Sequence, residues 1–233
     1  MRFGAPASVL FDFGGTLDAD GVRWAERFHQ AYRAEGGPLD FEAFEPLFRA
    51  SDRELLHNSG TRHLGFRAMI NAQASLIVES SADTRGIDAQ RVATRFHAAA
   101  LEVVNRNRPI LERLARQSRL GVVSNFTGNL DHCLEELDLA KFFDAVADST
   151  VVGQEKPDPR IFTQALAVLG TAPEESWMVG DNFEADIRPA QALGLRTCWL
   201  APAHRPSPPG ALFTARIARL PELVPALETA CTG

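Results

Sequence analysis

The sequence predicts an α/β fold in which a Rossmann-like parallel sheet is interrupted early by an all-α segment. A short apolar run, VLFDF, ends near Asp12 just before two glycines, as a buried strand does when it enters a turn. A long block with helical periodicity follows it. Beyond Pro109 the chain alternates between short β-rich runs and helical stretches, which is typical of parallel strands joined by helical crossovers.

The first expected element is a strand at residues 8–13, which stops at the Gly14-Gly15 turn. From about residue 22 to residue 104, apolar side chains recur at three- and four-residue intervals, and no run has strand character. The repeats are Trp24, Phe28 and Tyr32, then Phe41, Phe44, Leu47 and Phe48, and later Val92, Phe96, Ala99 and Val103. Breaks at EGGPLD, HNSG and SSADTRGID divide this block into several helices.

The second half of the chain carries the remaining strands, which are expected at residues 119–125, 143–149, 176–181 and 196–201. Helices are expected between them at residues 129–139, 159–170 and 184–194. A proline-rich loop, PAHRPSPPGALF, leads to a weak strand near residues 215–220 and a last helix from Pro221. The chain should therefore divide into a core, residues 1–17 and 105–233, and a helical insert, residues 18–104.

Composition narrows the class of partner. The 233 residues are 45% hydrophobic and 23% charged, with a net charge of -6 and no cluster of basic residues. These values are ordinary for a globular protein and argue against nucleic acid or an anionic membrane as a partner. No apolar run approaches the roughly 18 residues that span a bilayer. We expect a small-molecule ligand and a chain that acts as a monomer or homodimer.

Cysteine usage suggests a compartment. Cys133, Cys198 and Cys231 are widely spaced and form neither a disulfide framework nor a zinc pattern. Only MRFGAPA precedes the first expected strand, which leaves too little length for a signal peptide. A reducing, cytoplasmic location is therefore expected.

Polar side chains stand where the predicted strands end. They are Asp12, Ser124, Asn125, Lys156, Asp181 and Asp186, in chain order. In an open parallel sheet the carboxyl ends of the strands meet at one edge, where ligands collect. Lys156 is notable because the chain has only one other lysine, Lys141. The sequence therefore predicts a charged site at this edge.

Four motifs at these positions give the chain a resemblance to the haloacid dehalogenase-like hydrolases, which are mostly Mg²⁺-dependent phosphatases. The motifs are FDFGGTLD at residues 11–18, VVSN at 122–125, KPDP at 156–159 and VGDNFEAD at 179–186. The resemblance implies a Rossmann-like core and identifies the insert at residues 18–104 as a helical cap. It further implies that the cap closes over a small phosphorylated metabolite.

The resemblance also implies roles for individual residues. Asp12 would be the nucleophile that takes up a phosphoryl group as an aspartyl phosphate. Thr16 and Ser124 would donate hydroxyl hydrogen bonds to the phosphoryl oxygens, and Lys156 would neutralise the shared charge. The backbones of two further residues would bind the substrate phosphate, namely Gly15 and Asn125.

Mg²⁺ is the implied cofactor. Its ligands would be the side chains of Asp12 and Asp181 and the backbone carbonyl of Gly14. Asp186 would complete the metal site by holding either the water shell of the ion or Lys156.

One position departs from the family pattern. Phosphatases of this family carry a second aspartate two residues after the nucleophile, which protonates the leaving oxygen and later activates water, whereas this chain has Gly14. A general acid of this kind is typically worth about 10²–10⁴ in rate. Alkyl phosphates should therefore be poor substrates, and aryl or acyl phosphates better ones. Asp18, Asp20 or a residue of the insert are candidates to supply the proton.

Specificity should reside in the insert. By position alone, the candidates are Arg53, His57, Arg62, His63 and Arg67. The two histidines are more readily explained as surface or structural residues than as catalytic ones.

Two other functions remain open. A 2-haloacid dehalogenase would attack carbon with the same aspartate and without a metal, but it has little use for the pair Asp181 and Asp186 and carries a bulkier residue at position 14. A catalytically degenerate member would bind a ligand or partner without turnover, although buried charges without a task are costly to retain. Phosphonate cleavage through a Schiff base is disfavoured because residues 18–104 contain no lysine.

Overall fold

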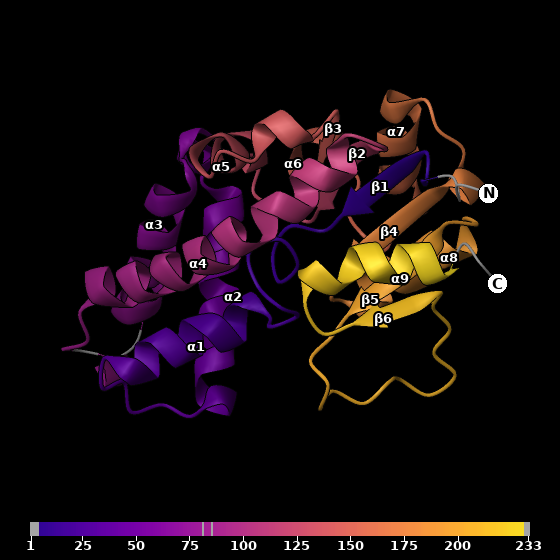
Figure 1. Cartoon of the computed structure of the whole chain (residues 1–233). Coiled ribbons are helices and arrows are strands. Elements are labelled where there is room, and N and C mark those ends of the chain that lie inside the picture. Colours follow the sequence, from indigo (N-terminus) through magenta and orange to yellow (C-terminus); the bar gives the residue numbers. More distant parts are fainter. Residues whose placement is uncertain (1–4, 81, 85, 231–233) are drawn as a thin grey trace.

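The structure, a computed structural model, describes residues 5–230 except residues 81 and 85, so Cys231 lies outside the described residues. Six parallel strands form one sheet in the order β3-β2-β1-β4-β5-β6 (Figure 1). They are β1(Ser8–Phe11), β2(Arg119–Ser124), β3(Ala145–Asp148), β4(Ser176–Gly180), β5(Arg196–Leu200) and β6(Ala215–Ile217). Every expected strand is present, and the α/β, Rossmann-like class is confirmed.

Helices fill most of the connections between strands. Between β1 and β2 the described residues form α1(Trp24–Ala34), α2(Phe41–His57), η1(Ser59–His63), α3(Phe66–Glu79), η2(Ala82–Thr84) and α4(Ala89–Ala115). The later helices are α5(Leu130–Glu136), η3(Ala140–Phe142), α6(Ser149–Val152), α7(Pro159–Leu169), η4(Pro173–Glu175), η5(Phe183–Ile187), α8(Arg188–Ala192), η6(Leu220–Glu222) and α9(Leu223–Ala230). We refer to α1–α4 as the helical segment, which lies beside the sheet in Figure 1.

Helix α4 crosses the boundary that the sequence suggested between residues 104 and 105. Asp88 caps its first turn through its side chain, and the helix continues through Pro109. The buried side chains continue past this proline, from Val104 to Leu111, so one apolar stripe serves the whole helix. Its length lets α4 contact α1 and α3 as well as strand β2. The change of sequence pattern at Pro109 thus falls inside a helix that joins the two parts of the molecule.

Two apolar layers cover the sheet, because side chains alternate along each strand. Leu10, Val123 and Met178 pack in one layer with residues of α7 and α8. Val9 and Phe11 point to the other face, where α5, α9 and the end of α4 supply the apolar contacts. A strand buried on both faces fixes its register firmly, so the residues at its end are placed firmly too.

Aromatic side chains join the helical segment to the sheet. The ring of Phe13, just after β1, makes edge contacts with Trp24 of α1, Phe66 of α3 and Phe126 of the loop after β2, at centroid distances of 6.4, 6.0 and 5.5 Å. Such pairs add to the energy of burial itself. The helical segment is therefore anchored directly beside the carboxyl end of β1.

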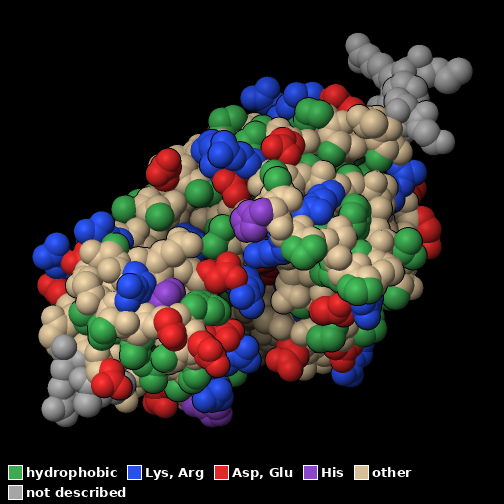
Figure 2. All heavy atoms as spheres, turned by 90° about the horizontal axis from the view of Figure 1, so that it is seen from below, with side chains coloured by type: hydrophobic (Ala, Val, Ile, Leu, Met, Phe, Trp, Pro, Cys, Tyr) green, Lys and Arg blue, Asp and Glu red, His purple; other side chains and the backbone are tan. Residues whose placement is uncertain are grey.

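The surface carries mixed charge. Figure 2 shows acidic and basic side chains interspersed over one face of the molecule, without a broad area of a single sign. Within the described residues, none of the helices combines the length and apolar character that crossing a bilayer requires.

Candidate active site

The register of the sheet brings the polar residues together at the strand ends. Strand β1 lies between β2 and β4, and Phe11 is paired with Val179 of β4. The N–H of Asp12 donates to the carbonyl of Val179 at 2.9 Å, so the residue continues the strand by one position. Ser124 ends β2 and Asp181 follows β4, at the same level of the sheet. Parallel pairing thus gathers side chains that are far apart in the sequence.

Lys156 lies at the centre of a buried network. Its Nζ is 2.6 Å from Oδ1 of Asp12 and 2.7 Å from Oδ1 of Asp186. The Ser124 hydroxyl donates to the same Asp12 oxygen at 3.1 Å. Burial alone would lower the pKa of Lys156, but the charges and hydrogen bonds of the two carboxylates outweigh it and raise the pKa. Lys156 is therefore a cation that fixes one oxygen of Asp12.

Asn125 acts through its side chain, which the sequence analysis did not anticipate. Its Nδ2 donates to the carbonyl of Lys156 at 2.9 Å, and its Oδ1 accepts from the N–H of Lys156 at 2.7 Å. This reciprocal pair ties the loop that carries the lysine to the end of β2. A sequence pattern does not reveal such a contact, since it depends on how the two loops pack.

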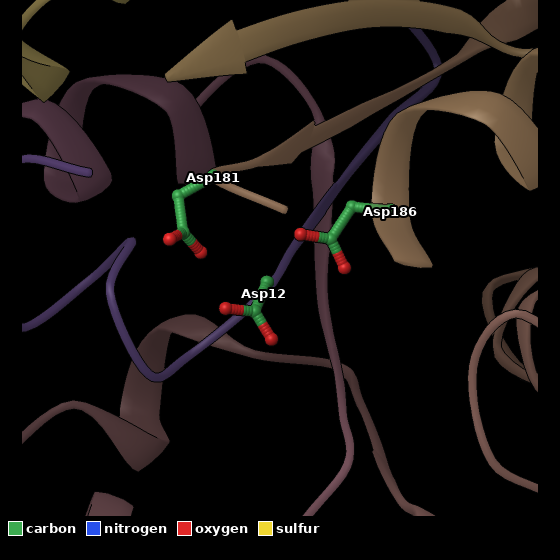
Figure 3. Close-up of side chains that lie close together, drawn as sticks. All are labelled: Asp12, Asp181 and Asp186. Atoms are coloured by element: carbon green, nitrogen blue, oxygen red, sulfur yellow. The ribbon is translucent and has the colours of Figure 1, made fainter. Parts of the chain in front are cut away.

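Three carboxylates converge at this edge, as Figure 3 shows for Asp12, Asp181 and Asp186. One oxygen from each lies within 4.8 Å of the others. Burial raises the pKa of Asp181, and the two neighbouring carboxylates raise it further. Burial also raises the pKa of Asp186 to about 6, although Lys156 opposes this shift. Ionisation of all three would leave an excess of negative charge around one lysine, which a bound cation would relieve.

The donor set fits Mg²⁺, which prefers oxygen ligands and usually takes one or two carboxylates. Asp186 is already engaged, because one oxygen binds Lys156 and the other accepts the N–H of Asn182 at 3.0 Å. Among the described residues, by contrast, no side chain or N–H binds the carboxylate of Asp181, which is only 5% exposed. Gly14 lines the same cavity. Asp181 is therefore the side chain most available to a metal ion.

The turn after Asp12 has a strict requirement at Gly15. Its φ is +97°, and a Cβ there would lie 2.8 Å from the carboxylate of Asp181, so both backbone and space demand glycine. The Gly15 N–H donates to Asp18 Oδ1 at 2.8 Å. Thr16 is fully buried, it does not line the cavity, and within the described part of the chain its hydroxyl oxygen has no hydrogen-bond partner. Phosphate contacts from Gly15 and Thr16 stay predictions.

The structure argues against Asp18 and Asp20 as substitutes for the missing acid. Asp18 is fully buried and also accepts hydrogen bonds from Trp24 Nε1 at 2.9 Å and from the Arg27 guanidinium at 2.5 Å. Asp20 pairs with Arg106 at 2.6 Å. Neither residue lines the cavity over Asp12. Both carboxylates serve as hydrogen-bond acceptors that hold the helical segment against the turn.

A cavity of about 950 Å³ opens over Asp12. The residues predicted at the strand ends line it, together with Gly14: Asp12, Ser124, Asn125, Lys156, Asp181 and Asp186. The facing wall comes largely from α2, through Phe48, Arg49, Asp52, Arg53, Leu55 and Leu56. Of the specificity candidates, Arg53 lines the cavity, whereas His57, Arg62, His63 and Arg67 are not among its lining residues.

A polar pair on the wall was also missed by the sequence analysis. Gln73 of α3 is fully buried and donates from Nε2 to Asp52 Oδ1 at 3.0 Å. Asp52 is open towards the cavity, yet the surrounding protein desolvates its carboxyl group and raises its pKa. The spacing of these residues on two different helices gave no signal of the contact.

The chain belongs to the haloacid dehalogenase-like hydrolase family, whose model matches residues 9–200. It is 31% identical to a ribulose-1,5-bisphosphate 5-phosphatase of Halopiger xanaduensis over 205 residues, which cover 84% of this chain and 85% of that protein. It is 45% identical to a phosphoserine phosphatase of Thermus thermophilus over 85 residues, 36% of this chain and 34% of the relative. A 2-haloacid dehalogenase structure from Pseudomonas syringae has a TM-score of 0.56 and 25% identity, covering 96% of this chain and 99% of its own. The resemblance stated above is confirmed at the level of the family.

Proposed function

We propose that this hydrolase is a Mg²⁺-dependent phosphatase that cleaves a small phosphorylated metabolite through an aspartyl phosphate on Asp12. The main support is the contrast between two adjacent carboxylates. Asp12 is fixed at one oxygen by Lys156 and Ser124, while Asp181 lies beside it without a partner among the described residues. A nucleophile that is held in place, beside a carboxylate that is available to bind a hard cation, suits covalent phosphoryl transfer assisted by a metal ion.

The chemistry follows from the hydrogen bonds. Lys156 and Ser124 hold Oδ1 of Asp12, which leaves Oδ2 to attack phosphorus. The bond from phosphorus to the ester oxygen breaks, and the alcohol leaves with a proton taken from solvent. Water then attacks the phosphorus of the aspartyl phosphate, which releases phosphate and restores the carboxylate. Lys156 stabilises the charge on Asp12 and on the transferring group throughout.

Mg²⁺, when bound, would neutralise charge on the phosphoryl oxygens. Asp12 and Asp181 would hold it through their side chains, and Gly14 through its backbone carbonyl. Asp186 would orient Lys156 and brace the loop after β4, through the bonds to Lys156 and to the Asn182 N–H.

We assign the role of a cap to the helical segment within residues 18–104. Its residues form the wall of the cavity opposite Asp12, so movement of this wall would open and close the site. Closure would shield the charged groups of the site from bulk solvent during phosphoryl transfer. A volume of about 950 Å³ is at the upper end of the usual range for small-molecule sites, which supports a metabolite as the substrate.

The names of two relatives support the phosphoryl class, since both are phosphatases of small phosphorylated compounds. The dehalogenase neighbour supports a second candidate, in which Asp12 attacks the halogen-bearing carbon of a 2-haloacid. Against it stands the third carboxylate, Asp181, which would repel an anionic haloacid in a site without a metal ion. A cytoplasmic location and a monomeric or homodimeric state stay predictions from the sequence.

A substrate panel tests the proposal. p-Nitrophenyl phosphate, acetyl phosphate, glycerol phosphate and 2-chloropropionate are each offered with Mg²⁺ and with a chelator. We expect phosphate release from the aryl and acyl phosphates, and only in the presence of Mg²⁺. Halide release that survives chelation would establish the dehalogenase instead. Phosphate binding without turnover of any compound would favour a catalytically degenerate member.

A further inference from the structure

The space beside Gly14 is occupied by Trp24. The φ of Gly14 is not in the left-handed region, so its backbone would accept other residues. A Cβ added there would nevertheless lie 3.1 Å from Nε1 of Trp24, which is closer than ordinary packing, and 3.4 Å from Cε2. The side chain that would normally project from this position is therefore replaced by an indole ring that comes from another element, α1.

The indole ring is held in place. Its Nε1 donates to Oδ2 of Asp18 at 2.9 Å, and Asp18 in turn binds the Arg27 guanidinium and the turn after Asp12. Within the described part of the chain, five phenylalanine rings surround the indole, with centroid distances between 5.3 and 6.4 Å: Phe13, Phe28, Phe66, Phe96 and Phe126. A ring fixed by one hydrogen bond and this much packing does not move aside at low cost.

The same ring faces the cavity. Trp24 is half-buried and lines the cavity together with Gly14 and Phe126, which is half-buried as well. The centroids of the Trp24 and Phe126 rings are 6.0 Å apart in an edge contact, and Met69 lines the same cavity. Because the only polar group of the indole is already bonded to Asp18, the ring offers the cavity an apolar surface. This surface adjoins Asp12 on the side of Gly14.

We propose that Trp24, together with Phe126, is a specificity-determining platform for the leaving group, and that the preferred substrates are phosphate esters of flat, aromatic alcohols. This inference rests on the proposed phosphatase function. An aromatic leaving group would lie against the indole, where offset and edge contacts between rings are favourable. Its oxygen departs as a stabilised anion, so a site with Gly14 and Trp24 in place of an acid suits it.

The platform is tested by binding, so that turnover is not needed. Isothermal titration in the presence of Mg²⁺ measures the dissociation constants of phenylphosphonate, methylphosphonate and inorganic phosphate. Wild type is compared with Trp24→Leu, Trp24→Phe and Phe126→Leu. Leu56→Ala serves as the control, because Leu56 lines the same cavity from α2 and lies 46% exposed.

We expect Trp24→Leu to weaken phenylphosphonate binding about tenfold, and Phe126→Leu to weaken it about threefold, in keeping with the value of aromatic pairs. Trp24→Phe should stay within about threefold of wild type. Methylphosphonate and phosphate should bind all variants alike, which also shows that the variants are folded.

Equal losses for phosphate and phenylphosphonate in Trp24→Leu and Phe126→Leu would overturn the platform, because they would mean a general disturbance of the site. Unchanged phenylphosphonate binding in both variants would overturn it as well. Failure of wild type to bind phosphate at all would refute the proposed function, and the platform with it. That outcome is distinct from normal phosphate binding without dependence on Trp24.

Discussion

The two walls of the cavity hold their charges in different ways. On the sheet side, Asp12, Lys156 and Asp186 are nearly inaccessible, and Lys156 bonds both carboxylates at once. On the side of α2, the Arg49 side chain is 66% exposed and, among the described residues, pairs only with Glu45 of its own helix. The buried network is fixed before any ligand arrives, as a reacting site requires. The exposed pair contributes little to stability and is free to rearrange around a ligand.

The largest effect should come from breaking the sheet-side network. Lys156→Met leaves buried carboxylates without their cation, so we expect a loss of about 3–5 kcal/mol of folding stability and at least a thousandfold loss of kcat. Arg49→Met on the opposite wall should change stability by less than about 1 kcal/mol. Urea denaturation measures the stability of both variants, and steady-state kinetics measures their kcat. Similar losses in the two variants would contradict the contrast between the walls.

Mg²⁺ binding should also depend on the sheet side of the cavity and not on α2. Mg²⁺ should bind in the millimolar range or tighter and should be required for turnover. Asp181→Asn should weaken Mg²⁺ binding by at least about 10–100-fold, because losing a direct ligand should cost no less than losing a residue that only orients a ligand. Asp52→Asn on α2 should leave Mg²⁺ affinity unchanged. Calorimetric titration measures the Mg²⁺ affinity of both variants. Turnover that persists in a chelator would show that the reaction does not need the metal.

Position 14 gives another test of the comparison, because Trp24 of the helical segment occupies the space beside Gly14 on the sheet side. Gly14→Asp should raise kcat/KM for alkyl phosphates about tenfold, a modest part of what a general acid contributes. The crowding by Trp24 should lower the Tm of this variant, and the gain should be larger in Gly14→Asp/Trp24→Leu. Both variants are compared in kinetics and thermal melts. No gain in a stable double variant that binds Mg²⁺ would mean that the proton comes from elsewhere.

The smallest expected effect is a pH dependence at Asp52. Its carboxyl group is open to the cavity, but the surrounding protein desolvates it and so raises its pKa above the value in the unfolded chain. A raised carboxyl pKa means that the folded state favours the protonated form. The stability that it contributes is therefore present at low pH and declines as pH rises from about 4, the unfolded value, through the folded pKa. Because solvent screens a group that is exposed to the cavity, Asp52→Asn should reduce the loss of stability between pH 4 and pH 7 by no more than about 0.5 kcal/mol, with Glu45→Gln as the control. An unchanged pH profile in Asp52→Asn would contradict the shift.

The fold, and the charged site at the carboxyl ends of the strands, were predictable because both depend on short-range sequence patterns. Strand ends can be recognised from apolar runs, and parallel strands bring Asp12, Ser124 and Asp181 to one edge of the sheet without further information. The contacts that refine the site come from the packing of separate elements. The pair of Asp52 with Gln73 leaves no trace in residue spacing, and the same holds for the indole over Gly14. From the sequence, Asp18 is also a candidate proton donor, whereas its burial beneath α1 makes it a structural acceptor.

The central claim is that Asp12 carries the phosphoryl group during turnover, and trapping the intermediate tests it most directly. The protein is mixed with p-nitrophenyl phosphate and Mg²⁺, quenched in acid within the first turnovers, digested and analysed by mass spectrometry. We predict a phosphoryl group on the peptide that contains Asp12, and none on Asp12→Asn, which should be folded and inactive. Turnover without phosphorylation of that peptide, or near-normal activity in Asp12→Asn, would contradict the covalent mechanism.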